Sequence, residues 1–146
     1  MSDHARFATR HPAPRRQKVS LFALGFGLAA APIAWAAQTI FGYVLSSQAC
    51  FPGDTPRGAP RFTAAVPIAT EINVIAILVA AVAAAIAYRS WRATRDESDG
   101  RVNRLVEIGE GRTRFLAACG VLTSLGFLVA MMVSSLAILL VPLCGR

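Results

Sequence analysis

Residues 19–49 form one apolar run directly behind Arg15, Arg16 and Lys18. About 20 consecutive apolar residues cross the hydrocarbon core of a bilayer, so this run is long enough to span it with some tilt or a kink. Two more such runs follow. The sequence therefore predicts an all-α integral membrane bundle of three transmembrane helices. The predicted basic tail covers residues 1–18 and the membrane domain residues 19–146, with spans at about 19–47, 67–88 and 115–141.

The charged residues are few and gathered outside these runs. Only 16% of the 146 residues are charged, against about 25% in a typical soluble domain. The net charge of +7 would suit a nucleic-acid partner if the arginines formed a patch. Because they instead flank the apolar runs, they indicate membrane orientation, and no nucleic-acid partner is predicted.

The distribution of positive residues predicts the topology. Lys and Arg number five in residues 1–18 and seven in residues 89–114. The remaining three are Arg57, Arg61 and Arg146. The positive-inside rule therefore places the N-terminus and the 89–114 loop in the cytoplasm. The first loop and the C-terminus face the periplasm in this reading, which describes a multi-pass protein of a bacterial inner membrane.

A cleaved signal peptide is the alternative interpretation of the first run. Basic residues, an apolar stretch and the sequence Ala34-Trp35-Ala36 resemble a secretory signal with its cleavage site. The apolar stretch before that site is longer than usual, and apolar character continues beyond it. These two features favour a retained transmembrane helix.

Gln38 is the polar side chain deepest in the first run, and it shares a helical stripe with Trp35 and Gly42. Together with the nearby Tyr43, these residues are the candidate contact with a partner helix, a lipid or a quinone. The alternative is an ordinary hydrogen bond between helices, which contributes about 0.6 kcal/mol on average.

Glu71 is the acidic residue inside a predicted span. An intramembrane carboxylate is a candidate proton relay or pore-lining group. Glu71 is also only about 6 Å along the helix from Pro67, where the second span is predicted to begin. At that depth the helix N-terminus and water stabilise an anion, so a structural role stays open.

The topology places Cys50 and Cys144 just outside the membrane on the same side. In an oxidising compartment they could form a disulfide between the ends of the first and third helices, and two free thiols are the alternative. Cys119 is interpreted as a small residue of the helix interior.

The sequence contains no set of residues typical of an enzyme or a cofactor site. His4 and His11 both lie in the tail, so a haem held by paired histidines within the membrane is not predicted. No nucleophile–base pair, metal motif or phosphate-binding loop is recognisable. We therefore expect no enzyme activity, no bound metal and no cofactor.

The chain resembles a family of small, uncharacterised three-span bacterial membrane proteins encoded beside haem–copper cytochrome oxidase genes. The likeness covers the first span to the C-terminus and involves no catalytic motif. The position of Gln38 is often a histidine in that family, which puts a cofactor or metal role at this position in doubt. The similar features are Pro32-Ile33-Ala34-Trp35, Gln38, Tyr43, Cys50, Pro52, the stretch Gly111-Arg112-Thr113-Arg114-Phe115-Leu116-Ala117, Gly120, Ser124, Phe127 and Pro142-Leu143-Cys144.

The resemblance implies association with a respiratory chain. The function expected from the sequence is thus a non-enzymatic accessory or assembly subunit of an inner-membrane respiratory complex, with a terminal oxidase as the first candidate partner. The alternative is a homo-oligomeric small transporter or channel subunit that uses Glu71.

Overall fold

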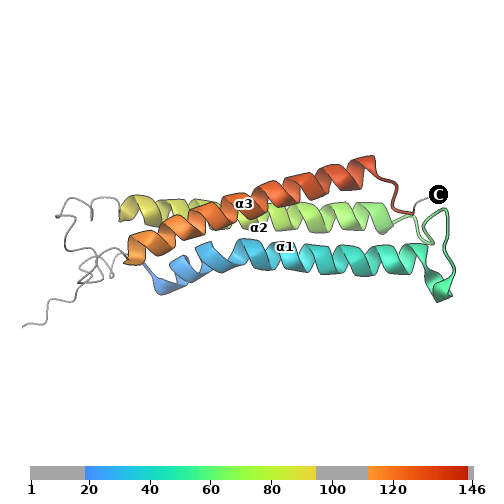
Figure 1. Cartoon of the computed structure of the whole chain (residues 1–146), viewed down its shortest axis with the longest axis horizontal. Helices are drawn as coiled ribbons and strands as arrows, with labels where there is room; N and C mark the ends of the chain where they lie inside the picture. Colours follow the sequence, from blue (N-terminus) through green and yellow to red (C-terminus); the bar gives the residue numbers. More distant parts are fainter. Residues whose placement is uncertain (1–18, 95–111, 145–146) are drawn as a thin grey trace, which may run out of the picture.

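The computed structural model describes residues 19–94 and 112–144, and in these residues the chain is helical without any strand. Three long helices, α1 (Leu21–Cys50), α2 (Ala65–Ala93) and α3 (Arg112–Leu140), run alternately up and down in one elongated bundle (Figure 1). A short 3₁₀ helix, η2 (Pro52–Asp54), follows α1. All three long helices are long and apolar enough to cross a membrane. The predicted all-α membrane bundle of three helices is therefore confirmed, whereas the predicted tail lies outside the described residues.

The helices are longer than the predicted spans, chiefly where they leave the apolar core. The second helix continues past Tyr88 to Ala93 and includes Arg89 and Arg92. Aromatic and basic residues at helix ends are typical of the membrane–water interface. The second span was predicted to begin near Pro67, and the helix that contains it begins two residues earlier, at Ala65. Proline is tolerated there because the N–H groups of the first turn have no partner inside the helix.

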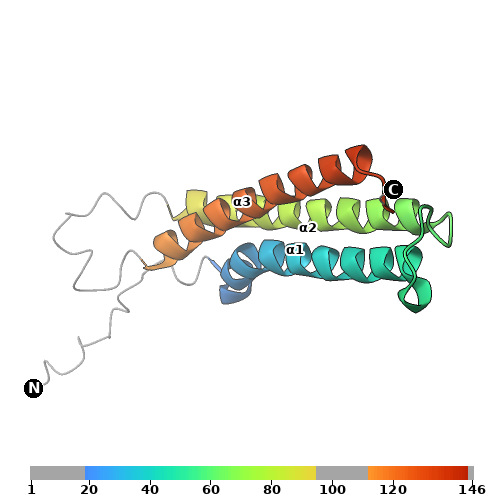
Figure 2. The same ribbon diagram turned by 45° about the vertical axis from the view of Figure 1, so that its right-hand side comes forward.

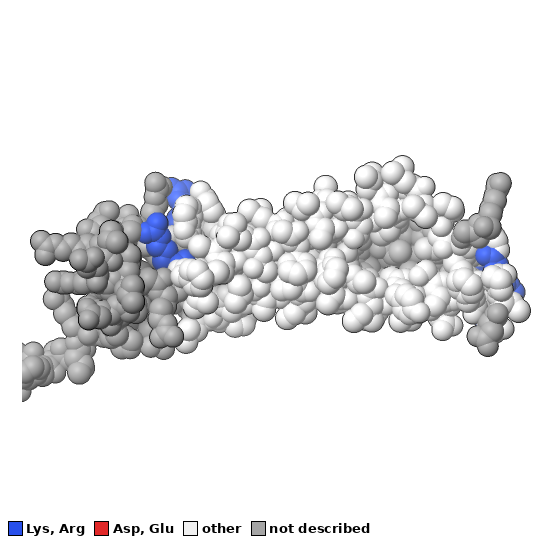
Figure 3. Space-filling view, in the orientation of Figure 1, with Lys and Arg blue, Asp and Glu red and all other residues white. Residues whose placement is uncertain are grey.

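The two ends of the bundle differ in their chemistry. We call the end formed by Leu21, Ala93 and Arg112 the arginine end, and the end formed by Cys50, Ala65 and Cys144 the disulfide end. Among the described residues on the face drawn in Figure 3, Lys and Arg lie only near these ends, and no charged residue is visible on the middle of that face. Figures 1 and 2 show α1 and α2 side by side, with α3 crossing them obliquely.

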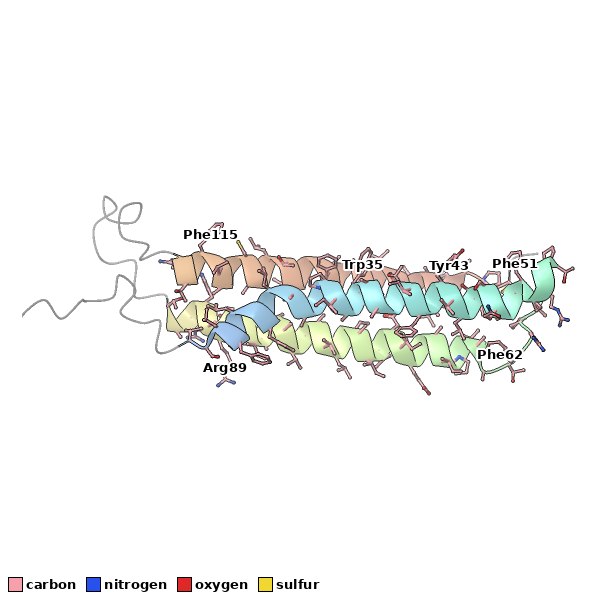
Figure 4. The ribbon with its side chains drawn as sticks, turned by 90° about the horizontal axis from the view of Figure 1, so that it is seen from below. Trp35, Tyr43, Phe51, Phe62, Arg89 and Phe115 are labelled. Atoms are coloured by element: carbon pink, nitrogen blue, oxygen red, sulfur yellow. A yellow bond between two sulfur atoms is a disulfide. The ribbon has the colours of Figure 1, made fainter. Side chains whose placement is uncertain are left out.

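The first helix begins at a side-chain cap and bends in its first third. The Ser20 hydroxyl accepts a hydrogen bond from the Phe22 N–H at 3.2 Å, which satisfies one of the free donors of the first turn. Pro32 lies inside the helix; it donates no hydrogen bond and crowds the carbonyl of Leu28, four residues earlier. The bend of α1 toward the arginine end is visible in Figure 4.

Small residues bring the three helices together. In lipid, helices associate through close packing rather than through the hydrophobic effect, so small side chains favour contact. Near the arginine end, Gly27, Ala87 and Gly120 meet so closely that a Cβ on Gly27 would lie 3.0 Å from the Cβ of Ala87. The Ser124 hydroxyl donates to the Gly27 carbonyl at 2.9 Å in the same layer. Further along, Ala31, Ala76, Ala80 and Met131 form a buried cluster.

The disulfide end is closed by a bond and a compact loop. The sulfurs of Cys50 and Cys144 lie 2.03 Å apart, at disulfide-bonding distance. The loop after α1 is held by backbone hydrogen bonds of 2.9 Å from the Arg57 N–H to the Cys50 carbonyl and from the Arg61 N–H to the Ala49 carbonyl. Gly53, with φ of 66°, provides the left-handed residue of the turn. This end is thus tied together through main chain and side chain.

Candidate functional site

Gln38 is buried near the middle of the bundle with an unsatisfied oxygen. Its side chain is only 8% exposed, and its Oε1 atom has no hydrogen-bond partner among the described residues. It lies about 4 Å along the axis from the midpoint of α1. A buried amide oxygen without a partner is costly, since its desolvation is not compensated. The oxygen of the deepest polar side chain of the predicted site therefore lacks a partner within the described part of the chain.

The Gln38 side chain lines an apolar groove between α1 and α2. The groove has a volume of about 560 Å³. Of its lining side chains, only that of Gln38 is polar. The lining residues are Phe26, Ala29, Ala30, Ile33, Ala34, Ala37, Gln38 and Phe41 of α1, with Ile72, Ile75, Ala76 and Val79 of α2. The sequence analysis did not identify this groove, because it exists only when the two helices are paired.

Trp35, Gly42 and Tyr43 of α1 lie outside the lining of this groove. Trp35 packs against Phe127 of α3, with 5.4 Å between the ring centroids. Its side chain is 36% exposed and that of Tyr43 is 74% exposed. A Cβ added to Gly42 would meet nothing within 4 Å. Figure 4 labels Trp35 and Tyr43 along the edge of α1 that is drawn against α3 in that view. We call these three residues the α1 outer face.

The predicted stripe is therefore divided between two surfaces. Residues three apart on a helix are about 60° apart around its axis. This angle is enough for Trp35 to contact α3 while Gln38 lines the groove next to α2. The helical period alone placed both residues on one stripe, since it does not include the positions of the neighbouring helices.

Glu71 is exposed on α2, near the disulfide end. Within a single chain it is not turned toward the bundle interior. A shared pore lined by Glu71 would therefore have to lie between chains.

Asn73 is a buried polar residue that the sequence analysis did not select. It is 5% exposed, and its Nδ2 donates to the Ser135 hydroxyl of α3 at 3.0 Å. Its Oδ1 has no partner among the described residues. The available signal was its position on the line of buried alanines that includes Ala69, Ala76 and Ala80. Asn73 thus connects α2 to α3 through an interhelical hydrogen bond.

The cysteines and the remaining titratable groups add no further site. Cys50 and Cys144 form the bonded pair described above, and Cys119 is a half-buried free cysteine of α3. Within residues 19–94 and 112–144, no group of three or more His, Cys, Asp or Glu side chains is arranged to hold a metal ion. The two candidate surfaces are therefore the groove and the α1 outer face. No family model, curated protein or solved structure matches this chain.

Proposed function

We propose that this protein is a non-enzymatic accessory or assembly subunit of a larger bacterial inner-membrane complex, with a respiratory terminal oxidase as the first partner to test. The α1 outer face supports this proposal. Gly42 leaves open space beside α1, which allows the backbone of another helix to approach closely. Trp35 and Tyr43 of the same helix are 36% and 74% exposed, and Trp and Tyr are enriched at binding interfaces.

The helical glycines fall into two groups. Gly27 and Gly120 are in contact with neighbouring helices of this chain, whereas Gly25, Gly42 and Gly126 have open space beside them. The Ser46 hydroxyl donates a hydrogen bond to the Gly42 carbonyl at 2.8 Å, one turn earlier in the same helix. Gly42 and Ser46 are therefore two small residues four apart, the spacing typical of helix–helix contacts in membranes.

The replacement Gly42→Leu tests the proposed contact. The leucine fills the open space, so we expect the partner to be lost from a mild-detergent pull-down while the protein still inserts. Gly25→Leu is the matched control, because a Cβ on Gly25 of the same helix also meets nothing within 4 Å. Mass spectrometry and a haem absorbance scan of the eluate identify the partner. Equal recovery of the partner with both variants would contradict the proposal.

The variant Gln38→Leu tests whether the partner contacts the α1 outer face or the groove. Because Gln38 lines the groove next to α2, its replacement should leave the α1 outer face and the partner unchanged. Loss of the partner in Gln38→Leu but not in Gly42→Leu would move the contact from the outer face to the groove.

A second candidate function, a homo-oligomeric transporter or channel subunit, is favoured by the exposure of Glu71. A carboxylate at this depth that faces away from its own bundle could line a pore between copies. In that case Glu71→Gln should abolish ion flux in proteoliposomes and the pull-down should yield only this chain. Flux that persists in Glu71→Gln would remove this alternative.

A further inference from the structure

We propose that the groove between α1 and α2 binds a phenol or hydroquinone that carries a linear apolar chain, with its hydroxyl donating to Gln38. This binding site is separate from the α1 outer face and does not depend on the proposed partner. Three properties of the groove carry the inference: its volume, its length and the unpaired oxygen of Gln38.

The size of the groove suits a small molecule with a linear chain. Along α1 the lining extends from Phe26 to Phe41, which is about 22 Å. The volume of about 560 Å³ falls within the range of about 300–1,000 Å³ found for small-molecule sites.

The chemistry of the lining selects an apolar molecule with one hydrogen-bond donor. The wall is formed by apolar side chains such as Phe26, Ile33 and Val79, and Gln38 is its only polar residue. The Oε1 atom of Gln38 is buried and has no partner in the described part of the chain, so it can accept a hydrogen bond from a hydroxyl in the groove once the amide rotates. The terminal torsion of glutamine is soft, and the amide can turn toward the groove while α1 stays in place.

The depth of Gln38 excludes an ordinary phospholipid as the specific ligand. The polar groups of a phospholipid stay at the interface, about 15 Å from the centre of a hydrocarbon core that is about 30 Å thick. Gln38 lies close to the middle of α1, so an acyl chain in the groove brings no donor to it. The ligand must instead carry its hydroxyl into the membrane interior.

The position of Gln38 within the groove also orients the ligand. Gln38 lies near the Phe41 end of the lining, and Ile72 and Ile75 of α2 line the same groove. An aromatic head group at this end can pack against the Phe41 ring in an offset or edge-to-face arrangement. The chain then extends for about 18 Å toward Phe26, at 1.5 Å per residue of α1.

The experiment uses two probes that differ by one hydroxyl, 4-dodecylphenol and dodecylbenzene. Binding to the purified full-length protein is measured by native mass spectrometry from nanodiscs over a concentration series. Wild-type protein should bind one 4-dodecylphenol about fivefold more tightly than dodecylbenzene, the effect of about one hydrogen bond. In Gln38→Leu the two probes should bind equally.

A matched pair of variants tests the location. Ala37 lines the groove, so Ala37→Phe should block the binding of both probes. Ala81 is an exposed residue of α2 outside the lining, so Ala81→Phe should bind like the wild type. Circular dichroism and the Cys50–Cys144 bond on a non-reducing gel establish that each variant is folded.

Two results would overturn the proposal. Equal affinities of the wild type for both probes would mean that the groove accepts apolar chains without recognising a hydroxyl. Unchanged binding in Ala37→Phe would place the probes elsewhere on the protein and leave the groove to a helix of a partner or of a second copy.

Discussion

Replacing Gly120 by leucine is expected to destabilise the bundle by about 3 kcal/mol, the upper part of the range for overpacking a core. A Cβ on Gly120 would lie 3.3 Å from the backbone carbonyl atoms of Gly27 and 3.3 Å from the Cβ of Ala87. Two neighbouring helices therefore limit the space, and one of the obstacles is main chain. Since a backbone cannot move like the end of a flexible side chain, α1 and α3 must separate to accommodate the leucine.

The separation should also weaken a hydrogen bond in the same layer. The Ser124 hydroxyl, one turn further along α3, donates to the Gly27 carbonyl at 2.9 Å. Ser124 is fully buried. Without the Gly27 carbonyl, its hydroxyl could donate only to carbonyls of α3 that already accept backbone hydrogen bonds. The steric and polar effects of Gly120→Leu therefore act in the same direction.

The measurement is the thermal unfolding of the purified protein in detergent, followed by circular dichroism. Gly126→Leu is the control on the same helix, because a Cβ on Gly126 meets nothing within 4 Å. Leucine favours a helix by about 0.8 kcal/mol relative to glycine, so the control should be as stable as the wild type or slightly more stable. Similar melting curves for the two variants would show that the helices do not cross at Gly120.

A compensating change makes the test specific to the crossing. Gly27→Ala would place its Cβ 3.0 Å from the Cβ of Ala87. The second change Ala87→Gly removes that Cβ, so the double variant should recover part of the stability lost in Gly27→Ala. Recovery of this kind is expected only if Gly27 and Ala87 are in direct contact.

Much of this fold could be predicted because the membrane allows few solutions. Backbone polar groups in lipid must be satisfied internally, so three long apolar runs lead to three helices. The boundaries were less predictable. In the sequence, Tyr88 marks the predicted membrane–water interface, yet α2 continues to Ala93. A helix can extend beyond the membrane because its backbone hydrogen bonds continue while its arginine side chains lie in water.

The candidate site was predicted in part. Gln38 was selected from the sequence as the deepest polar side chain of the first run, and the structure adds that it is buried in the bundle. Its environment could not be predicted, because the groove is formed by side chains of α2 that lie far away along the chain. The hydrogen bond between Asn73 and Ser135 could not be predicted for the same reason. Periodicity predicts which residues share a side of one helix, but it contains no information on which helix lies opposite.

Loss of the Cys50–Cys144 bond is expected to cost about 2–4 kcal/mol of stability. The two cysteines are separated by 94 residues. A loop of about 100 residues corresponds to about 4.7 kcal/mol in the chain-entropy model, which is an upper value here because the membrane already restricts the unfolded chain. Cys50, Cys144, Ala49 and Ala65 also form a buried cluster, and the bond holds residues 141–144 against it.

The pattern among the variants distinguishes the bond from local packing. Cys50→Ser, Cys144→Ser and the double variant should lose the same stability, because either replacement alone removes the bond. Cys119→Ser is the control, since Cys119 is free and half-buried in α3. Adding a reductant should lower the melting temperature of the wild type to that of the variants and leave the variants unchanged. Additive losses in the double variant would instead assign the stability to two separate side-chain contacts.

The same bond provides a test of the proposed orientation. In intact spheroplasts, a membrane-impermeant reductant followed by an impermeant maleimide should label Cys50 and Cys144 if the disulfide end faces the periplasm. Cys119 lies within α3, near the arginine end, and should remain unlabelled until the membrane is opened. Labelling of the pair only after lysis would invert the topology predicted from the arginines. The bond would then be exposed to a reducing cytoplasm, where disulfides rarely persist.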